Sequence, residues 1–310
     1  MMKLTIVIPC YNEEEVLPWT LGKMDALVAQ LKLTAATEAS LLLVDDGSHD
    51  RTWDIICEAA KAKPYVHGLK LSHNEGHQNA LWAGLQESAA TSDAVVSIDA
   101  DLQDDESTII DMARLVNEGK DIVYGVRKSR KTDSWFKRFT AQSFYRLMKS
   151  VDKEVIYNHA DFRMMTRRAV EALMLYPERN LFLRAIVRQL GFNEGFVYYD
   201  RRPRTAGESK YPLKKMLAFS VDGITSFSIA PLKFITYIGL ATTIISLIMI
   251  VFAIIRYSEG ETTPGWTSIL VSLWFIGGII LTALGVTGVY IGKIFIEVKR
   301  RPRYFVQQRV

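Results

Sequence analysis

The first two-thirds of the chain alternate short apolar, β-branched segments with longer, helix-like segments of mixed polarity. Short apolar runs that end at polar residues are typical of buried strands. Strands that alternate with helices predict right-handed βαβ units and an α/β fold with a mostly parallel central sheet. We expect strands at Leu4–Ile8, Leu41–Val44, Val66–Leu71, Ala94–Ile98 and Ile122–Tyr124, and helices at Glu13–Leu31, Thr52–Ala62, Gln78–Ala89 and Ser107–Asn117.

The pattern is less regular beyond this point. Residues from Trp135 to Gly191 are predicted to be mainly helical, and Phe196–Tyr199 is expected to form a late strand. The stretch from Tyr211 to Pro231 mixes apolar and basic residues, which is typical of helices that lie along a membrane surface.

Two uncharged apolar runs follow, of 22 residues from Phe234 to Ile255 and of 27 residues from Trp266 to Gly292. A helix that rises about 1.5 Å per residue crosses a hydrocarbon core of roughly 30 Å with either run. The alternative is a pair of buried core helices, although such helices rarely run so far without a charge. We therefore expect two membrane spans, at about 232–255 and 266–292.

The distribution of charge predicts how the spans are oriented. Basic residues gather before the first span, between Arg201 and Lys215, and after the second, from Lys293 to Arg303, whereas the link 256–265 holds one Arg and two Glu. The positive-inside rule places both flanks, and hence both termini, in the cytosol of a multi-pass membrane protein. The net charge of +4 is too small to indicate a nucleic-acid partner. The two cysteines suit a reducing compartment, and the N-terminus leads directly into a strand rather than a signal peptide.

Polar, acidic and aromatic residues follow the ends of the predicted strands. In a parallel sheet ligands bind beyond the carboxyl ends of the strands, so these residues are expected to share one rim. They comprise the segments Pro9–Glu13, Asp45–Ser48, Ser72–Gly76 and Asp99–Gln103.

Asp99 and Asp101 are the strongest candidates for metal ligands. Two carboxylates one residue apart after an apolar strand cannot both enter a core without a large cost, but both can face one ligand from a turn. Oxygen ligands of this kind suit Mg²⁺ or Mn²⁺ shared with the phosphates of a nucleotide. The alternative is a strand-end turn whose acids cap the next helix.

The other rim segments fit a nucleoside. Either Asp45 or Asp46 is able to accept a hydrogen bond from the imide N–H of uracil, Tyr11 to stack on a base, and Glu13 to bind ribose hydroxyls. Each also has a plainer reading, as a turn, a helix cap or an N-terminal helix acid. The chain contains neither G-x-G-x-x-G nor G-x-x-x-x-G-K-[ST], so neither a dinucleotide-binding nor a P-loop site is expected.

Together these segments resemble family 2 glycosyltransferases with a GT-A fold. The residues that carry the likeness are Val7–Glu13, Val44–Ser48 and Asp99–Gln103. Asp161-Phe162-Arg163, the segment Arg204–Tyr211 and the two C-terminal spans resemble one branch, the polyprenyl-phosphate glycosyltransferases. This branch includes dolichol-phosphate mannose synthases and bacterial undecaprenyl-phosphate glucosyl- and N-acetylglucosaminyl-transferases.

The resemblance implies a role for each matching residue. Donor-binding residues would be Pro9, Tyr11, Glu13, Asp45, Asp46, Asp99 and Gln103, with Asp99 and Asp101 holding Mg²⁺ or Mn²⁺. The catalytic group would be Asp161, Asp101 and Arg127, with Asp161 as a base or positioning group. The acceptor phosphate would lie near Arg204, Ser209 and Lys210. Two departures affect the donor side: Asp105-Glu106 stands where relatives often have proline, and His77 where many have lysine.

The resemblance also implies an architecture and a reaction. The expected parts are a cytosolic catalytic domain (1–210), juxtamembrane amphipathic helices (211–231), a two-helix transmembrane domain (232–292) and a basic cytosolic tail (293–310). The expected reaction is inverting transfer of one sugar, with UDP-glucose or UDP-N-acetylglucosamine favoured, to a polyprenyl phosphate at the cytosolic membrane face, for cell-envelope glycan modification. Relatives of this type form tetramers, so a homotetramer is a further expectation.

Two other readings stay open. A processive polysaccharide synthase resembles this catalytic domain but carries a Q-x-x-R-W motif and usually more spans, and this chain has neither. A non-catalytic membrane scaffold is disfavoured by the full set of rim acids.

Overall fold

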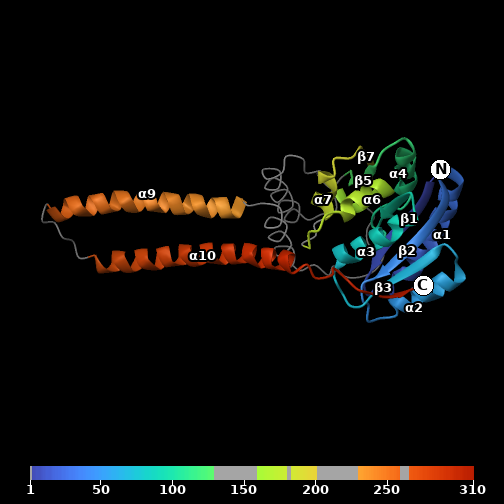
Figure 1. The fold of residues 1–310 in the computed structure, drawn as a ribbon, viewed down its shortest axis with the longest axis horizontal. Coiled ribbons are helices and arrows are strands. Elements are labelled where there is room, and N and C mark those ends of the chain that lie inside the picture. The colour runs from blue at the N-terminus through green and yellow to red at the C-terminus, as the bar shows by residue number, and fades with distance from the viewer. Residues whose placement is uncertain (1, 129–158, 180–182, 201–229, 259–264) are drawn as a thin grey trace. The chain divides into compact units, whose positions relative to one another are not determined.

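A computed structural model describes residues 2–128, 159–179, 183–200, 230–258 and 265–310 (Figure 1). The chain divides into two compact units, of which one comprises residues 1–210 together with 301–310 and the other residues 211–300. Of the expected surface helices at 211–231, residues 211–229 lie outside the described residues, as does the stretch 135–158.

An eight-stranded sheet forms the centre of the larger unit, in the order β7-β5-β6-β4-β1-β2-β3-β8. Most strands run parallel, while β6 and β8 run against their neighbours. The strands are β1 (Met2–Cys10), β2 (Ala36–Asp45), β3 (Val66–Leu71), β4 (Ala94–Ser97), β5 (Ile122–Arg127), β6 (His159–Thr166), β7 (Glu194–Tyr199) and β8 (Val306–Arg309). The expected α/β GT-A-like fold with a mostly parallel sheet is therefore confirmed.

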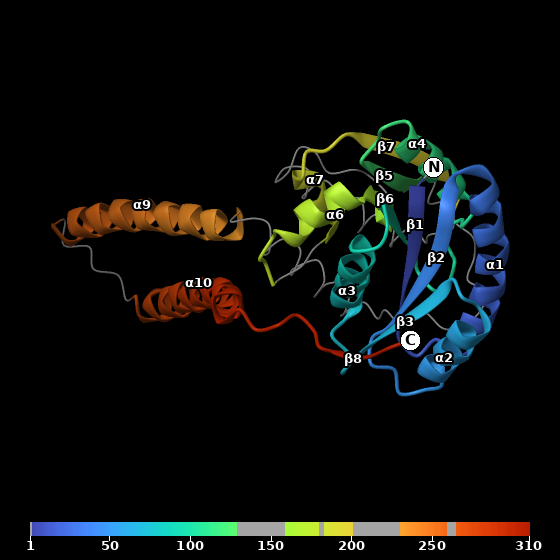
Figure 2. The ribbon, with the colours of Figure 1, turned by 45° about the vertical axis from the view of Figure 1, so that its right-hand side comes forward.

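Helices cover both faces of this sheet. Figure 2 shows α1 and α2 on one side of the strands and α3 on the other. The helices are α1 (Leu17–Thr34), α2 (Thr52–Ala62), α3 (His77–Ala89), α4 (Thr108–Asn117), α6 (Arg167–Met174) and α7 (Leu183–Gln189). Each of the strands and helices expected in residues 4–124 is present, with helix α1 starting at Leu17 rather than Glu13.

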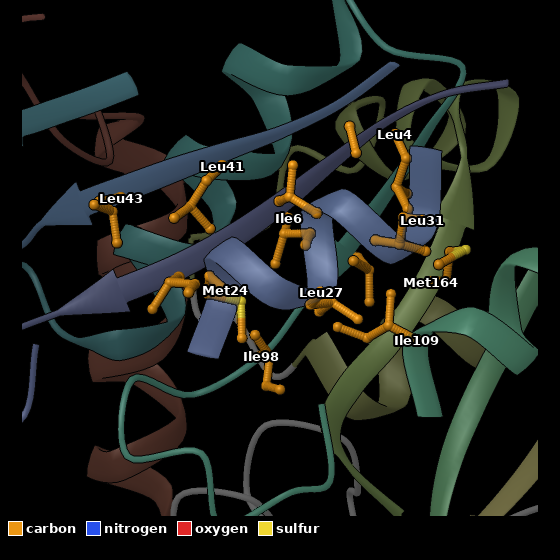
Figure 3. Packing of buried hydrophobic residues seen from close by; sticks show 14 of the residues in the cluster. Leu4, Ile6, Met24, Leu27, Leu31, Leu41, Leu43, Ile98, Ile109 and Met164 are labelled. Carbon is orange, nitrogen blue, oxygen red and sulfur yellow. The ribbon is translucent and has the colours of Figure 1, made fainter. Parts of the chain in front are cut away.

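Alternation along the strands divides the core between the two faces. Leu4 and Ile6 of β1 pack with Met24 and Leu31 of α1 (Figure 3), all fully or almost fully buried. Val7 points to the opposite face, where a Cβ added to Gly84 of α3 would lie 2.3 Å from its Cγ1. Glycine at this position lets α3 approach the sheet closely, which fixes the helix whose N-terminus borders the rim.

Strand β6 corrects the expectation of a mainly helical stretch from Trp135 to Gly191. Residues 159–166 form a strand between β4 and β5, antiparallel to both. The pattern concealed it because Asp161 and Arg163 are charged yet almost fully buried, at 7% and 1% exposure. Helices α6 and α7 agree with the expectation, and the expected late strand Phe196–Tyr199 falls within the observed β7.

The smaller unit contains two long helices, α9 (Ala230–Ser258) and α10 (Trp266–Lys299). Both are long and apolar enough to cross a membrane, with candidate spans at Pro231–Met249 and Phe275–Lys299, and neither span is buried within the described structure. Helix α10 ends at Lys299, and the next residue, Arg300, adopts a left-handed conformation (φ 46°). The chain then returns to the sheet as β8, so part of the expected tail 293–310 is folded into the larger unit.

Candidate functional site

The carboxyl ends of β1, β2, β4 and β5 lie on one rim of the sheet, as the parallel pairing requires. Strand β6 runs the other way, so its first residues reach the same rim. This geometry brings Asp161 towards Asp99, with His77 at the start of α3 between them. The His77 Nε2 lies 3.8 Å from Asp99 Oδ1 and 3.8 Å from Asp161 Oδ2.

The loops after β1 and β2 are joined by backbone-to-side-chain hydrogen bonds. The Asn12 amide donates to Ser48 Oγ (3.0 Å), and the His49 amide donates to Asn12 Oδ1 (2.9 Å). The Glu13 amide donates to Thr52 Oγ1 (2.9 Å). Asn12 adopts a positive φ of 52°, which Asn tolerates better than most residues. These bonds fix the loop that presents the exposed ring of Tyr11, beside the buried end of β1 at Pro9.

The two adjacent acids at the end of β2 have different environments. Asp46 accepts hydrogen bonds on both oxygens, from the Glu75 amide (2.8 Å) and the Gly76 amide (3.0 Å). Burial raises the pKa of Asp46, and these two backbone hydrogen bonds act in the opposite direction. Asp46 therefore braces the loop that leads into α3.

Asp45 is fully buried and retains an acceptor. Its Oδ1 accepts from the Ser48 amide (3.1 Å), whereas its Oδ2 has no hydrogen-bond partner within the described part of the chain. The nearest cation is the ammonium group of Lys70, at 4.0 Å. A buried carboxylate oxygen without a donor is costly, so this oxygen is suited to receive an N–H group from a ligand.

The loop after β4 presents Asp99 and Asp101. Thr20 of α1 donates to the Ala100 carbonyl (2.6 Å), and the Gln103 amide donates to Asp101 Oδ1 (3.3 Å). The buried Leu102 takes a positive φ of 42° and turns the chain sharply. This turn leaves the Asp99 side chain 49% exposed.

The electrostatics at Asp99 favour a cation. Loss of hydration raises the pKa of Asp99, His77 opposes the rise, and neighbouring carboxylates, including Asp101, add to it. A divalent cation would relieve this crowding of negative charge. In the described residues no three His, Cys, Asp or Glu side chains converge as a metal cluster.

Arg127 is bound at the end of β5 by residues that the sequence analysis did not identify. Its Nη2 donates to Asp104 Oδ1 (3.1 Å), and its Nε donates to the Tyr199 hydroxyl (3.3 Å). Tyr199 in turn donates to Asp104 Oδ1 (2.6 Å). Arg127 thus ties the segment after Gln103 to the ends of β5 and β7. Asp104 continues the polar run of this loop, whereas Tyr199 gave no signal in the sequence.

Asp161 is the most heavily paired acid of the site. Arg184 of α7 donates to both its oxygens, from Nη2 (3.0 Å) and Nε (3.3 Å), and Arg163 donates to Oδ1 (3.2 Å). Gln78 of α3 donates to Oδ2 (3.4 Å) and accepts from the Leu183 amide (3.1 Å). Sequence reasoning missed Arg184 and Gln78 because they belong to helices that meet only in the fold.

These partners determine the charge of Asp161. Burial alone would raise the pKa of Asp161, but the guanidinium groups of Arg184 and Arg163 outweigh it and hold the pKa well below its usual range. Asp161 is thus a poor proton acceptor at neutral pH. The three remaining expected residues, Arg204, Ser209 and Lys210, lie outside the described part of the chain.

Comparison with known proteins identifies the family. Residues 5–174 match the family described as Glycosyl transferase family 2. A glycosyltransferase of Bacillus subtilis strain 168 is 52% identical over 98% of this chain and 90% of its own length. A prophage-derived bactoprenol glucosyl transferase of Shigella flexneri is 40% identical over 99% of this chain and 98% of its own length.

A solved structure of a mycobacterial protein shows the same fold, with a TM-score of 0.51 at 18% identity, over 72% of this chain and 73% of that chain. The family match and the near-full-length relatives agree with the rim of acids at the strand ends. This chain belongs to the family 2 glycosyltransferases.

Proposed function

We propose that the enzyme transfers one sugar from a UDP-sugar, glucose or N-acetylglucosamine, to a polyprenyl phosphate at the cytosolic membrane face, with inversion. The observation that carries this proposal is the meeting of two acidic centres across His77: the accessible Asp99 on one side and the arginine-paired Asp161 on the other. The first suits a metal-bound donor, and the second suits an anionic acceptor. The near-full-length Shigella relative, named as a bactoprenol glucosyl transferase, favours glucose and a polyprenyl carrier.

The donor's base would lie over the loops after β1 and β2. Asp45 Oδ2 is buried and lacks a hydrogen-bond donor, whereas both oxygens of Asp46 already accept hydrogen bonds. We therefore assign Asp45 Oδ2 as the acceptor for the imide N–H of uracil. Tyr11, which is 38% exposed, is available to stack on the base. Glu13 would accept hydrogen bonds from the ribose hydroxyls, and Pro9 would lie at the bottom of the nucleoside site.

The diphosphate would lie against Asp99, Asp101 and Gln103 with Mg²⁺ or Mn²⁺. A hard cation often binds to one or two carboxylates and completes its shell with substrate phosphates and water. Two accessible carboxylates therefore fit such an ion without a third acid. When bound, the ion neutralises charge that develops on the departing UDP.

The acceptor needs little help to lose a proton. A phosphate monoester has a second pKa near about 6, so a lipid phosphate is largely dianionic at neutral pH. One of its oxygens attacks the anomeric carbon while the bond to the UDP oxygen breaks, and UDP leaves with that electron pair. No proton transfer is required. Asp161, ionised and paired with both Arg184 and Arg163, would orient the partly exposed Arg184 towards the phosphate rather than act as a base.

Other parts of the chain would support the acceptor. Arg204, Ser209 and Lys210 would bind its phosphate near the membrane, and Arg127 would hold the donor loop in place and add positive charge. Helices α9 and α10 would anchor the enzyme in the membrane, with the link between them outside and the catalytic unit in the cytosol. We further propose a homotetramer, which mass photometry of the chain in nanodiscs would detect.

The function is tested by incubating the full-length chain in nanodiscs with polyprenyl phosphate, Mn²⁺ or Mg²⁺, and a panel of labelled nucleotide-sugars. The proposal requires a lipid that carries a single β-linked sugar after an α-linked UDP donor. A growing polymer would instead indicate a processive synthase. No transfer from any donor would indicate a non-catalytic scaffold.

A further inference from the structure

The last ten residues form part of the catalytic unit. Strand β8 pairs antiparallel with β3, with Arg309 opposite Leu69 and Val306 opposite Leu71. Gly68 and Val310 exchange backbone hydrogen bonds of 2.8 and 3.0 Å. This strand is anchored at its far end, where Arg309 donates to both oxygens of Glu87 near the end of α3.

Arg303 lies between the end of α10 and this strand, and it contacts two further elements. Its guanidinium carbon lies 3.7 Å from the ring centroid of Trp82, a buried residue of α3. Its Nη2 donates to the carbonyls of Tyr176 (2.7 Å) and Glu178 (2.6 Å), just beyond the end of α6. Backbone carbonyls outside regular secondary structure need hydrogen-bond donors, and stacking of the guanidinium group on a buried indole strengthens the contact.

The two elements that Arg303 joins are those that surround Asp161. Helix α3 supplies Gln78, one turn from Trp82, and the segment after Glu178 leads into α7 with Arg184. Gln78 already links the two helices, because it bonds both Asp161 and the Leu183 amide. Arg303 is a second link that starts from α3, and it reaches Tyr176 and Glu178, which precede α7 in the chain.

We propose that Arg303 is a positioning residue, which holds Tyr176 and Glu178 against α3 and thereby sets Arg184 and Gln78 around Asp161. The inference rests on the proposed function in one respect, namely that the Asp161 side of the site receives the lipid phosphate. It also gives the segment that leaves the membrane helix a direct part in shaping the acceptor half of the site.

The test compares three variants of the full chain in nanodiscs. Arg303→Ala removes the link, and Arg303→Lys keeps the charge but loses the planar fork that stacks and bonds two carbonyls. Arg309→Ala is the matched control, since it also removes a link between β8 and α3, and the side-chain hydrogen bonds of Arg309 in the described part of the chain go to Glu87 rather than to α6 or α7. Each variant is examined by hydrogen–deuterium exchange and by steady-state transfer kinetics.

For Arg303→Ala we expect faster exchange in residues 183–189, with unchanged exchange in α1 and α2. We also expect kcat/KM for polyprenyl phosphate to fall by about tenfold to a hundredfold, the scale of a small misplacement in a site, with the donor KM unchanged. Arg303→Lys should recover part of both effects, and Arg309→Ala should show neither.

Equal behaviour of Arg303→Ala and Arg309→Ala in both measurements would overturn the proposal. So would a rise in the donor KM equal to that of the acceptor. If Arg303→Ala does not fold, Arg303→Lys carries the same comparison. If the wild-type chain transfers no sugar, the proposed function fails, while the exchange experiment still decides whether Arg303 positions α7.

Discussion

At the scale of single residues, Asp161 combines deep burial with a full negative charge. Its two arginine partners compensate for lost hydration, and they come from different elements: Arg163 from the same strand and Arg184 from α7. Arg163 is 1% exposed and depends on this one carboxylate for its charge balance within the described contacts. Removing the carboxylate charge would leave a buried cation uncompensated.

We expect Asp161→Asn to lower the free energy of unfolding by about 3 kcal/mol at neutral pH, because it breaks a buried ion pair. The folded-state pKa of Asp161 is depressed, so its stabilisation is complete above the unfolded value of about 3.9 and is lost as pH falls below it. The difference in the free energy of unfolding between wild type and variant should therefore become smaller in acid. Urea unfolding at several pH values measures it. Asp111→Asn, at an exposed pair with Arg114, is the control and should cost under about 1 kcal/mol.

The same low pKa predicts how the rate depends on pH. Asp161 stays ionised between about pH 5 and 8, because its pKa lies well below the usual range for an aspartate. Transfer should instead rise through about pH 6 as the acceptor phosphate becomes dianionic. Asp161→Asn should lower the rate but keep the shape of this profile. A folded variant whose activity is lost by many orders of magnitude at every pH would show that Asp161 is indispensable.

Asp101→Ala tests the metal prediction. Isothermal titration of UDP with and without Mn²⁺ should show that wild type gains affinity from the metal and that the variant does not, because one of two carboxylate ligands is absent. Asp111→Ala, on the exposed face of α4, should behave as wild type. Unchanged metal dependence in Asp101→Ala would exclude Asp101 as a ligand.

At the scale of elements, the packing of α3 on the sheet can be tested with a pair of glycines. In Gly84→Ala the added Cβ would meet Val7 Cγ1 at 2.3 Å and Val44 Cγ2 at 2.9 Å, so α3 or β1 must shift. We expect a loss of about 1–3 kcal/mol of stability, typical of overpacking. Gly22→Ala in α1 meets nothing within 4 Å and should stabilise by about 0.5–1 kcal/mol. Thermal unfolding of both variants measures the contrast, and a neutral Gly84→Ala would contradict the close packing.

The elements also show how far the sequence could predict this fold. Strands with uninterrupted apolar runs, such as β1 and β4, were recognisable because burial on both faces requires such runs. Strand β6 was not, because Asp161 and Arg163 read as surface charges, and their burial depends on pairing with each other and with Arg184 of α7, which appears only in the fold. Strand β8 was not, because Gln307 and Arg309 are exposed at the sheet edge and look like a polar tail.

Some residues of the candidate site could also be placed from the sequence, and others could not. The position of Asp45, Asp99 and Asp101 on one rim could be predicted because they follow recognisable strands, whose ends the parallel topology gathers. Arg184 and Gln78 could not, since their role depends on how two helices pack around Asp161. Asp46 was placed on the correct rim, but its bonds to the amides of Glu75 and Gly76 appear only in three dimensions.

At the scale of the whole molecule, the pairing of β8 with β3 makes the last residues part of the catalytic fold. Deleting residues 306–310 should expose the edge of β3 and remove packing at Gly68, where Val310 covers the strand. We expect a lower melting temperature for the catalytic unit and greater aggregation of the full chain. Static light scattering during a thermal ramp measures both. A truncated chain that melts and scatters as the full chain does would show that β8 is dispensable.

The same pairing limits how the chain can thread a bilayer. Residues 1–210 and 301–310 build one folded unit, so the segment between them must leave and return on the same side of any membrane it enters. The number of crossings is therefore even, whatever the flanking charges are. A design that removes or adds one transmembrane helix would place β8 on the opposite side of the bilayer from β3. The sheet would then lose its edge strand, together with the Arg309–Glu87 link to α3.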